Sequence, residues 1–191
     1  MDQIDVIGGA EPLGLVLGIM CVFFMAGTLG YFALHLRSLI AVLRRGAVVA
    51  SPVIPALAIA GIAVAGYLGY VRLAETAPVC GPLVDCGLLQ TSTYAAIMGV
   101  PVAFLGLLAN LGCLALWWMQ QRPGDEWAAA ALLLLAVFGT LVSVYLTAVE
   151  LFVLRAVCPW CLLSAMLFTG MVAAVGLLLL DQAPRPNYFG D

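Results

Sequence analysis

The sequence predicts an all-α membrane protein with five transmembrane helices, and its composition and its long apolar runs lead to this fold class. Of its 191 residues, 65% are hydrophobic and 9% are charged, whereas a soluble domain carries about 25% charged residues. A helix needs about 20 mostly apolar residues to cross a bilayer. Five stretches meet this requirement: Leu13–Leu36, Val53–Val71, Tyr94–Met119, Trp127–Val149 and Ala156–Leu180.

The first apolar stretch is expected to stay in the protein as an additional membrane helix. Asp2 and Asp5 stand where a cleaved signal peptide carries positive charge, and the apolar run behind them is too long for such a peptide. We expect residues 1–50 to form this extra helix and a cytoplasmic loop, residues 51–182 the other four spans, and residues 183–191 a polar tail.

The arginines predict how the helices are oriented. The chain has no lysine, and Arg37, Arg44 and Arg45 cluster directly after the first span. Because cytoplasmic loops are enriched in positive residues, this loop is predicted to lie in the cytoplasm. The N terminus is then outside the cell and the C terminus is inside.

Four of the six cysteines fall on the predicted outer side of the membrane. Cys80 and Cys86 lie between spans two and three, and Cys158 and Cys161 open span five as a C-x-x-C motif. Disulfides persist outside the cytosol. A C-x-x-C motif forms a small, reducible ring and lowers the pKa of one thiol, and the start of a helix favours a thiolate further. This arrangement favours dithiol redox chemistry.

Two other interpretations of these four cysteines remain open. They form a zinc site only if Cys80 and Cys86 supply two ligands, and their five-residue gap is wide for such a site. Structural disulfides are the stronger alternative, since extracellular loops often carry them. A ring closed within one helical turn, however, constrains very little chain. No metal site is predicted.

The other two cysteines are given no function, and one helix face before the C-x-x-C motif is a candidate part of the site. Cys21 and Cys113 lie inside spans one and three, where a free cysteine behaves as a small buried hydrophobe. Leu146, Glu150 and Leu154 precede the C-x-x-C motif at helical spacing, and this face leads a hydrophobic ligand toward the thiols. For Glu150 itself, the favoured interpretation is an interfacial charge that ends span four.

Together these residues resemble the vitamin K epoxide reductase family, in particular its bacterial members. The resemblance covers about residues 55–180, and the segments 143–146 and 152–154 also resemble animal members. The matching pattern is Cys80-x5-Cys86, Ser92-x-Tyr94, Gly99-x-Pro101, Gly106 and, after two spans, Cys158-x-x-Cys161.

The resemblance implies a four-helix bundle, formed by spans two to five, around a site for ubiquinone or menaquinone. It implies that Cys158 and Cys161 are the active-site pair, with Cys161 engaging the quinone. Cys80 and Cys86 would relay electrons from an external thiol carrier. The residues implied at the quinone site are Ser92, Val102, Leu146, Leu154 and Cys161.

Two departures from the family pattern change the expected activity. Ala165 stands where the animal enzymes have a tyrosine, and Val102 stands where they have an asparagine that contacts the ligand. We therefore expect reduction of a quinone rather than of an epoxide. The thioredoxin-like domain fused to many bacterial members is missing from this sequence, so a separate thioredoxin-fold partner is expected.

The predicted function is oxidation of a dithiol carrier at a bacterial plasma membrane, which supports disulfide formation in exported proteins. Quinone-linked oxidases of the DsbB type catalyse the same net reaction, but their C-x-x-C pair comes first, the reverse of this chain. The alternative outside enzymology is a structural subunit with structural disulfides, bound to a larger membrane complex through Leu13–Leu36.

Overall fold

Nearly all of the described chain is helical in the computed structural model. Five helices are long and apolar enough to cross a membrane, which confirms the predicted fold class. Cys80, Cys86 and Ser92 lie outside the described residues. The structure describes residues 12–46, 48–74, 76, 96–97, 99–125, 127–154 and 157–183.

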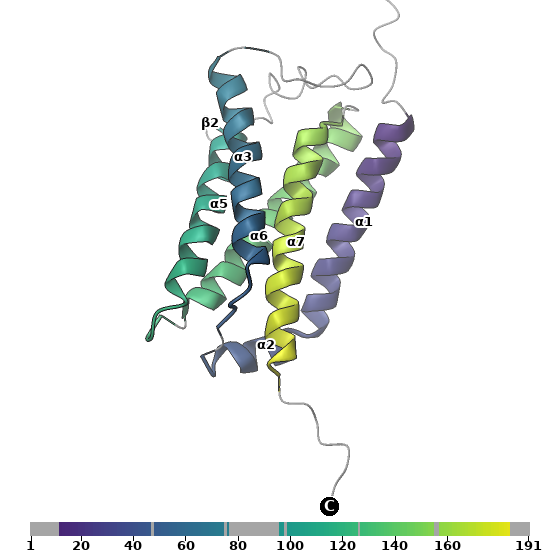
Figure 1. The fold of residues 1–191 in the computed structure, drawn as a ribbon. Helices are drawn as coiled ribbons and strands as arrows, with labels where there is room; N and C mark the ends of the chain where they lie inside the picture. Colours follow the sequence, from purple (N-terminus) through teal and green to yellow (C-terminus); the bar gives the residue numbers. More distant parts are fainter. Residues whose placement is uncertain are drawn as a thin grey trace, which may run out of the picture.

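The long helices run alternately in opposite directions (Figure 1). One end of the molecule therefore carries η2 and the start of α7, and we name it the Cys158 end; the other carries α2, and we name it the α2 end. The elements are α1 (Pro12–Leu34), α2 (Leu36–Leu43), α3 (Val53–Leu73), β1 (Ala96–Ile97), β2 (Val100–Pro101), α5 (Val102–Met119), α6 (Trp127–Val149), the π-helical turn η2 (Glu150–Leu154) and α7 (Pro159–Asp181).

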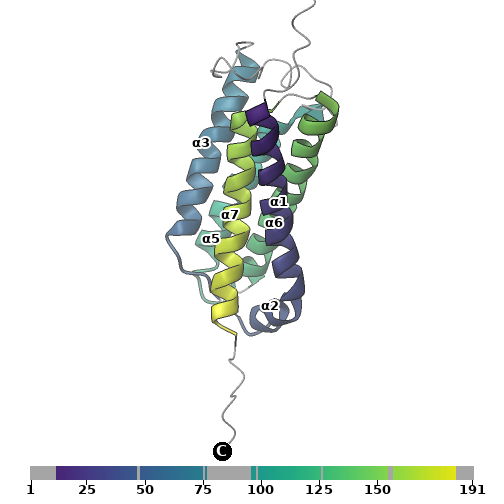
Figure 2. The same ribbon diagram turned by 90° about the vertical axis from the view of Figure 1, so that its right-hand side faces the viewer.

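Four of the long helices form a bundle, and the fifth lies outside it. Helix α3 packs against α5 and α7, and α6 packs against the same two helices to close the ring. Helix α1 packs on α6 and α7 from outside, and α2 lies across the far end of α7 (Figures 1 and 2). The bundle is thus built from α3, α5, α6 and α7.

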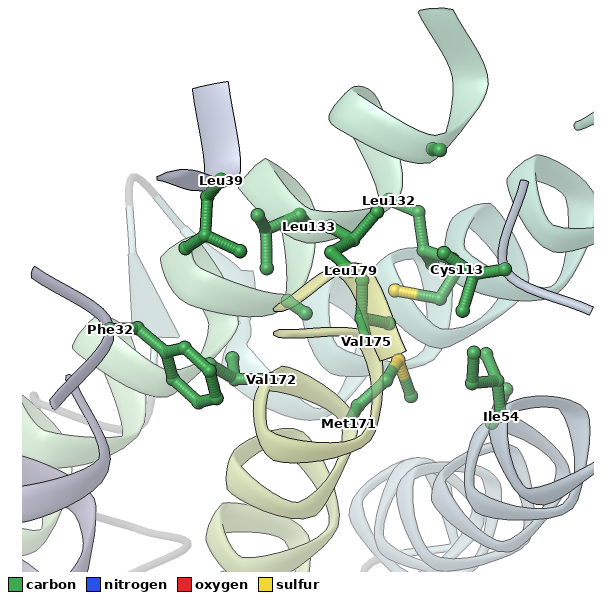
Figure 3. Packing of buried hydrophobic residues seen from close by; sticks show 14 of the residues in the cluster. Phe32, Leu39, Ile54, Cys113, Leu132, Leu133, Met171, Val172, Val175 and Leu179 are labelled. Atoms are coloured by element: carbon green, nitrogen blue, oxygen red, sulfur yellow. The ribbon is translucent and has the colours of Figure 1, made fainter. Parts of the chain in front are cut away.

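The α2 end of the bundle is solidly packed. Ile54, Cys113, Leu132 and Met171, one from each bundle helix, have no exposed surface and interlock in a single core (Figure 3). Phe32 of α1 joins the same core. Because apolar side chains gain little by leaving lipid for protein, this close packing is what holds the helices together.

Small residues allow the helices to approach closely at two crossings. On α3, a Cβ atom added to Gly61 would overlap the side-chain amide of Asn110 on α5. Asn110 Nδ2 donates a hydrogen bond to the Gly106 carbonyl at 2.8 Å. On α7, a Cβ atom added to Gly176 would overlap the ring of Phe32 on α1. These contacts follow the small-residue rule for membrane helices.

The predicted start of the third span is wrong by eight residues. The apolar run begins at Tyr94, but α5 begins only at Val102. The residues before it form an antiparallel hairpin, in which Ala96 pairs with Pro101. Gly99, at a φ of 82°, forms the turn, a conformation that glycine adopts without steric cost. Hydrophobicity alone did not separate this hairpin from the helix.

The segment after the first span, predicted as a loop, contains the short helix α2. It buries Leu39 and Val42 against the bundle and leaves Arg37 exposed. The chain that follows is held by Gln120 at the end of α5. Its side-chain amide accepts from the Val49 N–H at 3.1 Å and donates to the Val49 carbonyl at 3.0 Å. Both backbone groups are satisfied in this way.

Candidate active site

A cavity of about 600 Å³ lies at the Cys158 end of the bundle. All four bundle helices contribute to its wall, through mainly apolar side chains such as Leu68, Leu105 and Phe168. Leu108 and Phe138 line it and are also 63% exposed, so the cavity reaches the lipid-facing surface beside α5 and α6. Its size and apolar wall are typical of small-molecule sites.

Two thiols form part of the wall of this cavity. Cys158 is the N-cap residue of α7, with an extended backbone (φ −96°, ψ 117°), and Pro159 follows in the first helical turn. A proline fits there because the N–H that it lacks has no partner within the helix. Cys161 lies one turn on, and both sulfurs are free thiols that line the cavity. The predicted opening of span five by the C-x-x-C motif is confirmed.

Cys158 is the more acidic thiol. The pKa of Cys158 is lowered from 9.0 to about 7, chiefly because the Cys161 thiol donates a hydrogen bond to its sulfur. Burial opposes this effect, and the backbone N–H groups of Cys161 and Trp160 support it. Donors at a helix start stabilise a thiolate in the same way at other reactive cysteines. A large fraction of Cys158 is therefore ionised near neutral pH.

The residue between the two cysteines anchors the motif to the bundle. The Trp160 ring packs against Tyr67 of α3, with ring centroids 4.9 Å apart and an angle of 47° between the planes. Tilted aromatic pairs at this spacing are favourable beyond their buried area. The start of α7 is thus held against α3.

Glu150 is a third polar residue at the thiols. Its side chain is only 2% exposed, and Oε2 accepts a hydrogen bond from the Cys158 N–H at 3.2 Å. The interpretation of Glu150 as an interfacial charge is therefore wrong. Helix α6 does end at Val149, but the chain continues as the π-helical turn η2, which begins with Glu150 at the cavity wall.

A comparison with known protein families identifies the family of this chain. Residues 52–176, well over half of the chain, match the sequence model of the vitamin K epoxide reductase family. The chain belongs to the vitamin K epoxide reductase family. Membership, together with the five apolar helices, indicates a multi-pass membrane thiol–disulfide oxidoreductase that works with a quinone. Helices α1 and α2 precede the segment that matches the family.

The structure brings together all of the described site residues that the resemblance to vitamin K epoxide reductases implied. Val102, Leu146 and Leu154 line the same cavity as Cys158 and Cys161. Their contact with a quinone stays a prediction. The predicted relay pair, Cys80 and Cys86, and the predicted site residue Ser92 lie outside the described residues.

The position at which animal vitamin K epoxide reductases have a tyrosine does not line the cavity here. Ala165 is 1% exposed and packs with Cys21 and Met25 of α1 in a small second core. Cys21 is thus buried, as expected of a free cysteine in a span. The extra helix covers the side of α7 on which Ala165 lies.

Sequence reasoning missed several lining residues. Ser164 and Phe168 follow Cys161 at helical spacing and line the cavity, so reading the motif forward along α7 would have found them. Phe138 lies two turns before Leu146 on the same face of α6. Arg72, an exposed residue in the last turn of α3, also lines the cavity. No motif identified it.

Proposed function

We propose that this vitamin K epoxide reductase family member oxidises a thioredoxin-fold dithiol carrier and passes the electrons to ubiquinone or menaquinone. In this scheme Cys80 and Cys86 receive the electrons, and Cys158 and Cys161 deliver them to the quinone. The reaction supports disulfide formation in exported proteins at a bacterial plasma membrane, with the four cysteines on the outer side and the N terminus outside.

The observation that carries the proposal is the placement of two thiols in the wall of an apolar cavity that reaches the lipid-facing surface. A quinone has a hydrophobic ring and tail with polar oxygens on the ring only. The leucine and phenylalanine side chains suit the apolar parts, and Cys161, Ser164 and Glu150 suit the polar end. The residues present therefore fit a quinone.

Transfer into the buried pair proceeds by thiol–disulfide exchange. A carrier thiolate attacks the Cys80–Cys86 disulfide and forms a mixed disulfide with Cys80, which the second carrier thiol resolves. Cys86 then attacks the Cys158–Cys161 disulfide and forms a mixed disulfide with one of its sulfurs. The Cys80 thiolate attacks the Cys86 sulfur of that mixed disulfide, which releases the active-site thiol and restores the Cys80–Cys86 disulfide. Two electrons and two protons have then moved from the carrier to Cys158 and Cys161.

A bound quinone supplies the oxidising power by accepting two electrons and two protons. Cys158, with its pKa near 7, provides a thiolate at neutral pH, and Cys161 lies beside it in the wall of the cavity. Formation of the bond between the Cys158 and Cys161 sulfurs returns the pair to its starting state.

Anaerobic reduction of ubiquinone and menaquinone analogues by the purified protein, supplied with a dithiol, tests this proposal. Replacing Cys161 with serine removes the reacting sulfur, so turnover should fall at least about 10³-fold. Cys113→Ala is the matched control, because Cys113 is a buried thiol in the core of the α2 end. Equal turnover in wild type and Cys161→Ser, or none in the wild type, would contradict the proposal.

The direction of electron flow is tested in cells. When the protein is removed, the thiol carrier should accumulate in its reduced form, because its oxidant is missing. The redox state of the carrier is measured by alkylation and a gel-mobility shift. An unchanged ratio of reduced to oxidised carrier would contradict the proposed direction.

A further inference from the structure

One carboxyl group contacts both residues of the thiol pair. Glu150 accepts a hydrogen bond from the Cys158 N–H at 3.2 Å, and its side chain also forms a hydrogen bond with the Cys161 thiol. It is 2% exposed and lines the cavity. A carboxylate is expensive to bury without partners. Its position beside a reacting sulfur therefore calls for an explanation.

The backbone changes its form at this residue. Helix α6 is regular to Val149, and Glu150 begins the π-helical turn that runs to Leu154. A π-helical turn is less favourable than α-helix and occurs frequently at functional sites. The irregular turn coincides with the polar residue that contacts the thiols.

The extra helix α1 packs behind this turn. A Cβ atom on Gly18 would lie 2.6 Å from the Leu151 side chain, and one on Gly14 would lie 3.7 Å from Val157. Cys21, one turn further along α1, is close enough to Glu150 to be affected by its charge. Helix α1 thus covers one side of this turn, and Glu150 lines the cavity on the opposite side.

The titratable and charged groups around Glu150 are few among the described residues. Cys158 and Cys161 face it from the start of α7, Cys21 faces it from α1, and Arg72 of α3 lines the same cavity. Once Cys158 has ionised to a thiolate, Cys161 must still lose a proton when the pair is oxidised. The hydrogen bond between the Glu150 and Cys161 side chains gives that proton a direct route.

We propose that Glu150 is the proton-transfer residue of the thiol pair, a role that rests on the proposed function. Its carboxylate takes the proton from Cys161 Sγ as that sulfur is oxidised, so an S–H bond breaks and an O–H bond forms. The sulfurs of Cys158 and Cys161 then join in a disulfide, and two electrons leave to a quinone. Glu150 releases its proton into the cavity to one quinone oxygen.

The second proton that the quinone needs comes from the Cys158 thiol. The Cys158 thiol gives up its proton to water when it ionises, and water returns an equal proton to the other quinone oxygen. Two thiols and one quinone therefore become one disulfide and one hydroquinone. Carboxyl groups placed within hydrogen-bond reach of a reacting proton contribute about 10²–10⁴-fold to rates in other enzymes.

A purely structural role for Glu150 makes different predictions. As a partner for the Cys158 N–H, the carboxyl group is replaceable by an amide, because a glutamine oxygen accepts the same hydrogen bond. Glu150→Gln therefore keeps the size and the acceptor but cannot carry the proton. Glu150→Asp keeps the proton-carrying group and shortens its reach.

The first test requires no quinone. Purified protein is reduced with dithiothreitol, and the infrared spectrum of the oxidised form is subtracted from that of the reduced form. With no quinone to take it, the proton from Cys161 stays on Glu150 in the oxidised form, so we expect a carboxylic-acid C=O band in the difference spectrum, absent in Glu150→Gln and shifted in Glu150→Asp. Asp125→Asn is the control: it removes a carboxyl group from the loop before α6 at the α2 end, so the band should remain in this variant. A wild-type spectrum without the band, or a Glu150→Gln spectrum that retains it, would overturn the proposal.

The second test measures turnover with a ubiquinone analogue. Glu150→Gln should lose about 10²-fold or more, and Glu150→Asp should keep most of the activity that Glu150→Gln loses. Turnover of Glu150→Gln within about threefold of the wild type would overturn the proton-transfer role. If Glu150→Gln does not fold, the proton-transfer role is tested by the wild-type band and by its shift in Glu150→Asp, and the lack of either would overturn it. A wild type that reduces no quinone refutes the proposed function instead, while the redox-dependent band still reports on Glu150.

Discussion

The two ends of the bundle differ in packing although the same helices build both. At the α2 end, Leu132, Met171 and Leu179 are completely buried and fill the space between the helices. At the Cys158 end, the same helices enclose a cavity of about 600 Å³ with two thiols in its wall. One end serves to hold the helices together, and the other leaves room for a ligand. Substitutions at the α2 end should therefore lower mainly the stability of the protein, and substitutions at the Cys158 end should affect mainly its activity.

The largest expected effect comes from truncating a leucine at each end. Leu132→Ala should lower the free energy of unfolding by about 2–5 kcal/mol, since it opens a void in a filled core. Leu146→Ala enlarges a cavity that already exists, so it should cost less stability and raise the KM for quinone. Unfolding in detergent micelles and initial rates measure the two effects. An equal loss of stability in both variants would contradict the difference in packing between the two ends.

Adding a methyl group to a glycine at each end should have a smaller effect. Gly176→Ala overlaps the Phe32 ring at the α2 end and should destabilise the protein by about 1–3 kcal/mol with no change in KM. In Gly139→Ala the new Cβ would lie 2.5 Å from the Phe168 ring, which lines the cavity, so the KM should change.

The control for both glycine variants is Gly66→Ala. A Cβ atom at position 66 meets no atom within 4 Å, so this variant should keep both the stability and the KM of the wild type. Thermal unfolding and quinone titrations are compared across the three variants. A change in KM for Gly176→Ala without one for Gly139→Ala would contradict the assignment of the two ends.

The smallest expected change is a shift in a pH profile at the Cys158 end. Because the pKa of Cys158 is lowered to about 7, the reduced protein should be alkylated half-maximally near pH 7 instead of 9. The thiolate predominates above that pH and the less reactive thiol below it. Cys161→Ala removes the main hydrogen-bond donor and should move the midpoint upward. Cys161→Ser retains a donor and should keep it low. A wild-type midpoint near 9 would contradict the mechanism.

The sequence predicted the helices well because their length and apolarity are local properties. The predicted span Trp127–Val149 coincides with α6. The third span was misplaced because the hairpin before Val102 also consists mostly of apolar residues and runs directly into the helix. Helix α2 was missed because its eight residues are too few for a span.

The candidate site was predictable only in part. The C-x-x-C motif and helical spacing led to Cys158, Cys161, Leu146 and Leu154, which do line one cavity. Helices that are apolar on all sides do not show which face turns inward, so Phe138 was not foreseen. Glu150 was misinterpreted because its inward position depends on a π-helical turn and on packing against α1, neither of which has a sequence signature.

Photoaffinity labelling tests directly whether the cavity at the Cys158 end holds the quinone. A photoreactive ubiquinone analogue is irradiated with the purified protein, and the labelled residues are identified by mass spectrometry. Labels are expected around Leu108, Phe138 and Leu146, and excess ubiquinone should suppress them. Labels confined to the shallow apolar groove beside Trp117 and Trp118 at the α2 end, or labels that excess ubiquinone leaves unchanged, would contradict it.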